Sequence, residues 1–360
     1  MKENVSLQRD TWIRLKKNKG AVFGIIVITL AVLMAVFSYV IAPDHTPYAN
    51  RMILEIGGQK PGYTQRFLLI KKQQAVPQPS FLQEMISGEG DRYDWVPINM
   101  GQQEGDSLIV QQFIDEGISE RKSFFHPESD TDLKIKEKTF WLGTDRYGRD
   151  ILSRLIIGVR VSLAVGLITV ILSLSIGIFL GALAGYYGGK TDQLIMWLLN
   201  VIWSIPTLLL VFALTLLLGK GFWQVFIAIG LTMWVNVARI VRGQVLAVKE
   251  LEYVEAARAL GFNDSRIIIR HILPNILGPV MVIAASNFAS AIVIEAGLSF
   301  LGIGVQPPQP SWGLMIKENF NFIITHNPML ALAPGIAIML LVLAFNLLGN
   351  GLRDALNVKD

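Results

Sequence analysis

The chain has 360 residues, of which 52% are apolar and 17% are charged, with a net charge of +4 and no cysteine. This composition is too apolar for an ordinary soluble domain and predicts a membrane protein. Without cysteine the chain has no disulfide, thiolate metal site or cysteine nucleophile. The positive charge lies in short segments beside apolar spans and forms no separate basic patch, so we expect no nucleic-acid binding.

The first apolar segment, residues 21–42, contains no charged residue. As a helix it measures ~33 Å and can cross the hydrocarbon core of a bilayer. Its apolar run is too long for a cleavable signal peptide, so we expect a retained transmembrane helix. Residues 1–20 before it are basic, which predicts a cytoplasmic amino terminus.

Residues 43–156 connect the first span to the second. Within 43–150 there are 13 Lys and Arg residues against 17 Asp and Glu residues, a net of −4, whereas the rest of the chain carries +8. The apolar runs at 66–70 and 93–98, bounded by Gly, Pro and polar residues, predict strands. Because the connection exceeds the usual loop length, we expect a folded extracytoplasmic insert, α/β or β-rich, between helices 1 and 2.

Further apolar segments are each long enough for a transmembrane helix with modest tilt. Together with the first span they predict an all-α membrane protein, a six-helix bundle. Its core domain covers 157–349, and a cytoplasmic tail covers 350–360. Pro206 is expected to bend its helix. The segments are 161–184, 194–218, 222–238, 275–298 and 328–348.

The sequence Gly188-Gly189-Lys190-Thr191 resembles the end of a phosphate-binding loop. A phosphate-binding loop follows a strand, whereas an apolar helix precedes these residues, and the first required glycine position is Ala184. We therefore predict a tight cytoplasmic turn and no nucleotide site.

The charged loop at about 250–274 has the signals of two short helices at the inner membrane face. Gly261 can adopt positive φ and end the first helix, Asn263 or Asp264 can cap the second, and Pro274 suits the first turn of the next span. We also predict that the small side chains on one face of the first helix let a partner backbone approach closely. That stripe consists of Val254, Ala257 and Leu260 or Gly261.

The run from Glu255-Ala256-Ala257 to Gly261, with the later His-Ile-Leu-Pro-Asn at 271–275, resembles the EAA signature of bacterial ABC importer permeases. In that family the signature marks a coupling helix that sits in a groove of the ATPase subunit, and the His-Ile-Leu-Pro-Asn form is typical of the peptide-permease branch. The resemblance implies a set of ATPase-coupling residues: Tyr253, Val254, Glu255, Ala256, Ala257, Arg258, Leu260 and Gly261.

Three more blocks resemble the same branch. Residues 142–150, Leu-Gly-Thr-Asp-Arg-Tyr-Gly-Arg-Asp, match a stretch of C-type subunits in dipeptide and oligopeptide permeases, and the blocks at 295–313 and 345–356 also match. The resemblance covers roughly residues 140–360 and the first span. The insert is larger than we expect for this branch, and none of its residues inherits a role.

The resemblance implies a non-catalytic subunit of the bacterial cytoplasmic membrane, multi-pass, with both termini cytoplasmic. Its implied partners are a homologous B-type permease, two ABC ATPase subunits that bind ATP and Mg²⁺, an extracytoplasmic solute-binding protein and the lipid bilayer. The chain itself is expected to bind no cofactor. Peptide is the default substrate, but relatives in the branch move nickel or oligosaccharides. The insert's placement suits docking of the binding protein.

Polar residues within the spans are candidates for a substrate path. Asn236 and Asn287 can offer hydrogen bonds to a peptide, although such residues more often join helices. Glu295 has two interpretations, a group that lines or gates the path, or a structural pair with backbone or an arginine.

Two rival classes fit the sequence less well. An ion-coupled secondary transporter usually carries several ionisable residues within its spans, whereas Glu295 is nearly alone here. A receptor-like membrane protein gives no reason for the coupling motif. The histidines show no metal spacing and no hydrolase motif occurs, so we expect neither a metal site nor a catalytic residue. They are His45, His126, His271 and His326.

Overall fold

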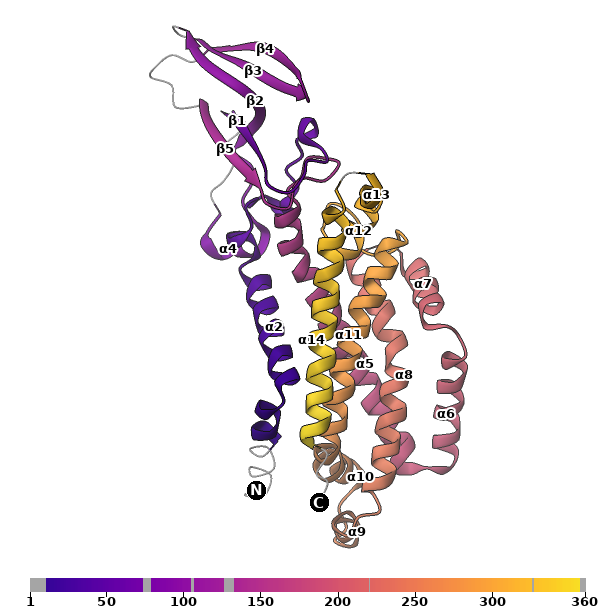
Figure 1. The fold of residues 1–360 in the computed structure, drawn as a ribbon. Helices are drawn as coiled ribbons and strands as arrows, with labels where there is room; N and C mark the ends of the chain where they lie inside the picture. The colour runs from indigo at the N-terminus through magenta and orange to yellow at the C-terminus, as the bar shows by residue number, and fades with distance from the viewer. Residues whose placement is uncertain are drawn as a thin grey trace. The chain divides into compact units, whose positions relative to one another are not determined.

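The computed structural model describes residues 11–73, 79–104, 107–125, 133–219, 221–325 and 327–356 (Figure 1). The chain divides into two compact units. Unit 1 comprises Met1–Val32, Ser162–Gln306 and Ile338–Asp360, and unit 2 comprises Leu33–Val161 and Pro307–Ala337. Several predictions fall partly outside the described residues, which leave out His126, His326, residues 1–10 of the predicted cytoplasmic segment, parts of the predicted insert and the last four residues of the predicted tail.

Within the described ranges, five helical segments are long and apolar enough to cross a membrane, and a bent pair would make a sixth if it counts as one span. The pair is α6 (Gly189–Trp203) and α7 (Thr207–Leu218), which meet at 90°. Pro206 lies at the break, as predicted from its missing amide hydrogen. The five segments are α2 (Lys19–Val36), α5 (Ile151–Tyr187), α8 (Phe222–Val248), Asp264–Phe300, which includes α11 (Leu273–Phe300), and α14 (Met329–Leu356).

Several helix boundaries differ from the predicted spans. The helix predicted at 161–184 begins at Ile151, and the one predicted at 222–238 continues to Val248. The tail predicted from residue 350 is helical to Leu356. The first span ends at Val36 and is followed by a short helix, α3 (Ser38–Ile41). The three helices that extend beyond their predicted ends share one cause, because hydropathy marks the apolar part of a helix while backbone hydrogen bonding continues through polar turns.

Small residues allow close helix packing in unit 1. On α5, glycines recur every fourth residue, and a Cβ on Gly177 would lie 2.4 Å from the Cβ of Val237 on α8. A Cβ on Gly181 would lie 2.5 Å from the carbonyl oxygen of Ala238. Similarly, a Cβ on Gly24 of α2 would lie 2.5 Å from the backbone of α14. Small residues at such spacing let membrane helices approach closely, and α8 also packs against α7 and α11.

Unit 2 contains a five-stranded antiparallel sheet with the order β4-β3-β2-β1-β5 (Figure 1). The runs predicted as strands at 66–70 and 93–98 lie in β1 and β2, and apolar side chains of β1 pack on both faces of the sheet. Phe67 and Leu69 belong to one buried cluster and Leu68 to another. The strands are β1 (Tyr63–Lys71), β2 (Tyr93–Glu104), β3 (Ser107–Asp115), β4 (Ile118–Phe125) and β5 (Leu133–Phe140).

Short helical elements complete unit 2. Its 3-10 turns η1 (Pro47–Ala49) and η2 (Leu54–Ile56) and helix α4 (Phe81–Ser87) come from the segment between α3 and β2. Helices α12 (Trp312–Asn319) and α13 (Phe322–Thr325) come from the segment between α11 and α14. The indole nitrogen of Trp312 donates to the carbonyl oxygen of Leu155 at 3.0 Å and so fixes α12 to the first turns of α5.

Candidate functional site

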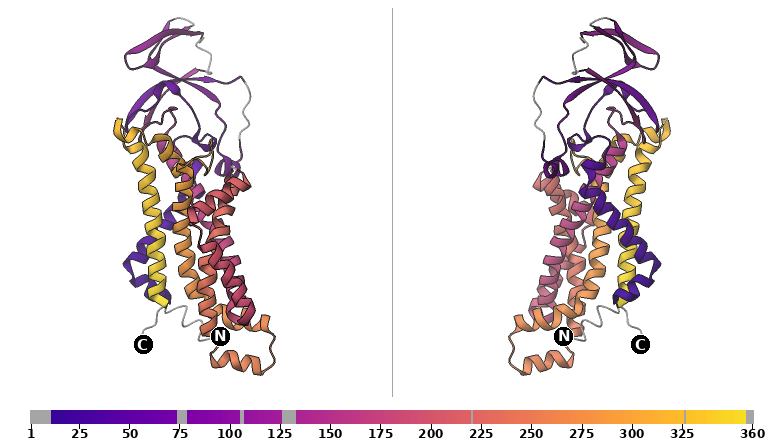
Figure 2. Two further views of the ribbon diagram at one scale, coloured as in Figure 1. Left: turned by 90° about the vertical axis from the view of Figure 1, so that its right-hand side faces the viewer. Right: turned by 90° about the vertical axis from the view of Figure 1, so that its left-hand side faces the viewer.

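The segment between α8 and α11 consists of α9 (Glu252–Ala259), α10 (Asp264–Ile267) and the π-helical turn η3 (Ile268–Ile272). We refer to these elements together as the α9–α10 segment. Figure 2 shows α9 lying across the direction of the long helices at their ends. The amide of Arg266 donates to Asn263 Oδ1 at 2.9 Å, so Asn263 caps α10 as predicted.

Gly261 ends α9 in the manner predicted from its type. Its φ is 76°, a conformation that strains residues with a Cβ. The amide of Phe262 donates to the carbonyl oxygen of Ala257 at 3.2 Å, and the amide of Gly261 donates to the carbonyl oxygen of Arg258 at 3.0 Å. These two bonds form a Schellman motif. Pro274 stands in the first turn of α11, also as predicted.

One face of α9 is buried in the chain's own core. Val254 is fully buried and Ala257 is 3% exposed, and both pack with Ile267 of α10. The prediction that these small residues face a partner is therefore wrong. The helix has only eight residues, and its two buried positions attach it to the bundle. The same cluster includes Val241 and Val245 of α8 and Ile272, Ile276, Val280 and Ile283.

Polar and aromatic contacts also hold the α9–α10 segment. The Tyr186 hydroxyl at the end of α5 donates to Asp264 Oδ1 at 2.7 Å. The Phe262 and His271 rings stack with their centroids 5.8 Å apart. The Tyr253 hydroxyl donates to the carbonyl oxygen of His271 at 3.4 Å, and burial raises the pKa of Tyr253. The segment is thus attached to α5, α8 and α11 at once.

The opposite face of α9 is exposed. Leu260 is 73% exposed, which is unusual for a leucine beside a well-packed core, and Glu255 and Arg258 lie on the same open side. Six of the eight predicted coupling residues are exposed: Tyr253, Glu255, Ala256, Arg258, Leu260 and Gly261.

A cavity in unit 1 has a volume of about 800 Å³. It lies among α6, α7, α8, α11 and α14, and its walls combine apolar side chains, neutral amides and hydroxyls with one charged side chain, Arg239. Asn236 and Asn287, predicted as path residues, both line it. The Asn287 side chain also donates to Ser173 Oγ of α5 at 3.3 Å. Asn287 therefore also joins two helices, which is the other role predicted for such residues.

Glu295 is not among the residues that line this cavity. Its side chain is fully buried, and Ser299 Oγ donates to Glu295 Oε1 at 2.6 Å. Ser299 Oγ in turn accepts from the amide of Val305 at 3.1 Å. Glu295 is thus paired with a serine one helical turn away.

Trp203, Arg239 and Asn346 are among the cavity residues that were not identified as path candidates from the sequence. Asn346 belonged to a family block, whereas Arg239 and Trp203 carried no signal for a path. The helical spacing from Asn236 to Arg239 and to Ile240 could have revealed one shared face of α8. Nothing in the sequence shows that the bend at Pro206 brings Trp203 to that face.

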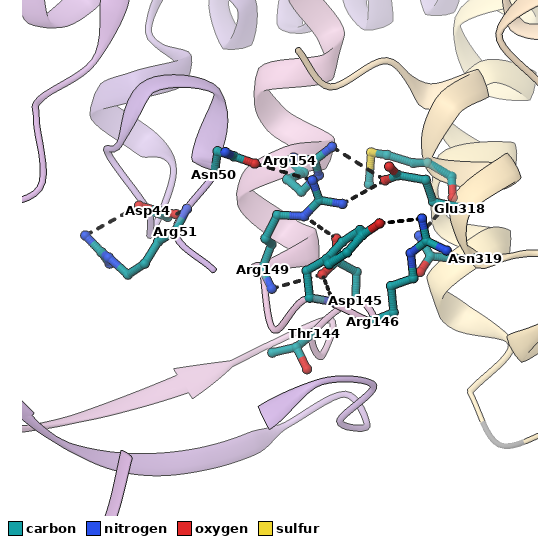
Figure 3. Close-up of polar contacts among 12 residues, drawn as sticks. Asp44, Asn50, Arg51, Thr144, Asp145, Arg146, Arg149, Arg154, Glu318 and Asn319 are labelled. Carbon is teal, nitrogen blue, oxygen red and sulfur yellow. Dashed lines mark hydrogen bonds and ion pairs between the residues drawn. The ribbon is translucent and has the colours of Figure 1, made fainter. Parts of the chain in front are cut away.

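The block at 142–150 forms a buried ionic cluster in unit 2 (Figure 3). Arg149 Nε donates to Asp145 Oδ2 at 2.6 Å, and Arg149 Nη2 donates to Glu318 Oε2 of α12 at 2.8 Å. Asp145 also accepts from the amide of Tyr147 at 2.9 Å. Arg154 is fully buried, with a guanidinium nitrogen 3.8 Å from Glu318 Oε2. The block therefore joins the start of α5 to α12.

Its two glycines are required by close backbone contacts. Gly148 has a φ of 72°, and a Cβ there would lie 1.7 Å from the carbonyl oxygen of Ile53. Gly143 has a φ of 80°, and a Cβ would lie 2.2 Å from the carbonyl oxygen of Gln59. Nearby, Lys138 Nζ lies 3.4 Å from Asp150 Oδ2, and burial lowers the pKa of Lys138 against the opposing effect of that carboxylate.

Two family models match the chain. The model described as "Binding-protein-dependent transport system inner membrane component" matches residues 177–359, which include the α9–α10 segment and the cavity residues. The model described as "N-terminal TM domain of oligopeptide transport permease C" matches residues 6–59.

Several individual proteins are similar to this chain, each over a different share of its length. The oligopeptide transport system permease protein OppC of Bacillus subtilis is 32% identical over 358 residues, 99% of this chain and 92% of that protein. That alignment spans the insert, so its size is not peculiar to this chain. The glutathione transport system permease protein GsiD of Pectobacterium atrosepticum is 45% identical over 219 residues, 61% of this chain and 72% of its own. A solved structure, the inward-facing MetNI methionine ABC transporter, aligns with a TM-score of 0.47 and 20% identity over 57% of this chain and 96% of that one.

Proposed function

Because the chain belongs to the family of binding-protein-dependent transport system inner membrane components, as an OppC/DppC-like ABC transporter permease, we propose that it carries peptides across the bacterial inner membrane. The names of its relatives refer to oligopeptide, dipeptide and glutathione transport, which supports a short peptide as substrate. The observation that carries the mechanism is the α9–α10 segment, which exposes one face and attaches the other to the transmembrane helices.

The exposed face of α9 docks on an ABC ATPase subunit. ATP and Mg²⁺ bind to two such subunits and not to this chain, which transmits the motion of the ATPases without chemistry of its own. Val254 and Ala257 fix α9 to α8, while Asp264 fixes α10 to α5, so a displacement of α9 moves several spans together. Glu255, Arg258 and Leu260 supply contact groups.

The cavity of unit 1 forms this subunit's half of the substrate path, and a homologous B-type permease completes it. Asn236 and Asn287 offer amide groups to a peptide backbone, and neutral donors and acceptors suit a substrate that is itself an amide. Glu295, which bonds to Ser299, stabilises the end of α11 and takes no part in the path.

The topology has six membrane crossings if α6 and α7 count as one bent span. The basic residues before α2 support cytoplasmic termini, and the α9–α10 segment is then cytoplasmic as well. We assign residues 1–20 to the cytoplasm, 43–156 to an extracytoplasmic insert with the entry to helix 2, and 157–349 to the core permease domain. The insert docks a solute-binding protein that delivers the peptide.

Two alternatives make different predictions. Relatives of another specificity would carry nickel or oligosaccharides along a similar path. An ion-coupled secondary transporter would need ionisable groups along its path, whereas the lining residues that the structure describes include no carboxylate.

The test is uptake into proteoliposomes that contain this chain with its second permease, ATPases and binding protein. We expect accumulation of a labelled tripeptide only with ATP and Mg²⁺ on the ATPase side, and no loss of uptake when ionophores dissipate the ion gradients. Uptake that follows the gradient without ATP would contradict the proposal. If Ni²⁺ or an oligosaccharide, and not other peptides, competes with uptake, the substrate belongs to that class instead.

A further inference from the structure

Arg239 of α8 is the one charged side chain among the described residues that line the cavity. Its guanidinium stacks over the Trp203 ring, with Cζ 4.0 Å from the ring centroid, and its Nη2 donates to Asn200 Oδ1 at 3.3 Å. A stacked and hydrogen-bonded guanidinium has few rotamers left to lose on binding a ligand, so it is pre-organised.

Arg239 carries its charge without an internal counterion. Among the residues that the structure describes, no carboxylate lies within 4 Å of its nitrogens, and its two contacts are with neutral groups. Arg242, one turn further along α8, differs, because it makes a bidentate ion pair with Asp192 at 2.5 Å for both bonds. The sequence thus neutralises one arginine of this helix and leaves the charge of the other available to a ligand.

The rest of the lining suits an anion attached to amides. Asn236, Asn287 and Asn346 contribute side-chain amides, and hydroxyl groups come from Ser286 and Ser290. The cavity volume of about 800 Å³ lies within the range of small-molecule sites. A planar guanidinium can bind a carboxylate through two parallel hydrogen bonds.

We propose that Arg239 binds the carboxyl-terminal carboxylate of the transported peptide and makes the path selective for peptides with a free carboxyl terminus. The inference rests on the proposed function and adds a specificity-determining residue to it. The neutral amides of the lining then hold the peptide backbone, and the absence of a carboxylate among the described lining residues leaves the peptide's amino terminus without a charged partner there.

The test compares tri-alanine with tri-alanine amide in the complete complex in proteoliposomes. Uptake of each peptide is divided by the fraction of binding protein that it occupies, which removes the binding protein's own preference. We expect the native complex to favour the free acid by about tenfold or more. Equal normalised uptake of the two peptides by the native complex would overturn the inference without any variant.

The variants assign the preference to Arg239. We expect Arg239→Gln to lower uptake of the free acid by about tenfold while uptake of the amide stays within about twofold, and Arg239→Lys to keep most of the preference. Lys190→Gln is the matched control, since it removes one exposed positive charge that lies outside the cavity. An equal loss of both peptides in Arg239→Gln would mean that the arginine supports the fold or binds lipid. Failure of the native complex to take up either peptide would contradict the proposed function itself.

Discussion

The Tyr186 hydroxyl donates a 2.7 Å hydrogen bond to Asp264 Oδ1 and joins the last turn of α5 to the first turn of α10. Through this bond and the apolar contacts of Val254 and Ala257, a force applied at α9 reaches helices that come from distant parts of the sequence. Other contacts also hold this end of unit 1, among them the buried apolar cluster and the Arg242–Asp192 pair, so removal of this one bond should affect transmission of motion more than folding.

Tyr186→Phe keeps the aromatic ring and removes only the donor. We expect a loss of about 1 kcal/mol in the attachment of α10, with less peptide transported per ATP hydrolysed while basal ATP hydrolysis persists. The measurement is the ratio of peptide uptake to phosphate release in proteoliposomes. Tyr187→Phe is the control, because Tyr187 is 53% exposed and lies next in the chain. Equal ratios in both variants would show that the bond does not take part in coupling.

Gly148→Ala should destabilise unit 2 strongly, because the new Cβ would lie 1.7 Å from the carbonyl oxygen of Ile53 and φ is also positive. Gly62→Ala is a matched control with a φ of 83° and no heavy atom within 4 Å of the added Cβ. We expect a cost of about 1–2 kcal/mol for the control from left-handed backbone strain alone, and more than about 3 kcal/mol at position 148. Melting temperatures of the two variants in detergent measure the difference, and equal shifts would contradict the close contact.

The two buried arginines near Glu318 should respond differently to replacement by methionine. Arg149→Met leaves the carboxylates of Asp145 and Glu318 without their nearest cation, and we expect a loss of about 3–5 kcal/mol in the free energy of unfolding. The Arg154 side chain makes no hydrogen bond with the described residues and only a 3.8 Å contact with Glu318, so Arg154→Met should cost less than about 1 kcal/mol or stabilise the unit.

Denaturant unfolding of the two variants, followed by the fluorescence of the native tryptophans, measures this difference. Trp312 lies close to the cluster, since it bonds to α5 through Leu155. A larger loss for Arg154→Met than for Arg149→Met would show that the pairing of Glu318 is not as described.

Local signals predicted much of this fold. Positive φ at Gly261, the cap at Asn263 and the break at Pro206 each follow from the chemistry of one residue type, so a single sequence is enough to identify them. The runs in β1 and β2 were also visible, because they alternate with turn residues.

Properties that depend on tertiary contacts could not be predicted in this way. Val254 and Ala257 have the spacing of a docking face, and only their contact with Ile267 and the ends of α8 and α11 reveals that they are buried. The same limit applies to Arg239 of α8, whose place in a cavity depends on its contact with Trp203, just before the bend between α6 and α7. The close approach of α5 and α8 at Gly177 and Gly181 is likewise a property of two helices together.

The most direct test of the account is ATP-driven tripeptide uptake by the complete complex with Glu255→Arg, compared with Glu250→Arg. Both residues are exposed and both changes reverse one charge, but Glu250 precedes α9 and Glu255 lies on its open face. Neither change should alter the stability of this chain by more than about 0.5 kcal/mol. The account predicts that Glu255→Arg lowers uptake by about tenfold or more, while Glu250→Arg keeps it near the native rate. Native uptake by Glu255→Arg would contradict the claim that α9 couples this permease to its ATPases.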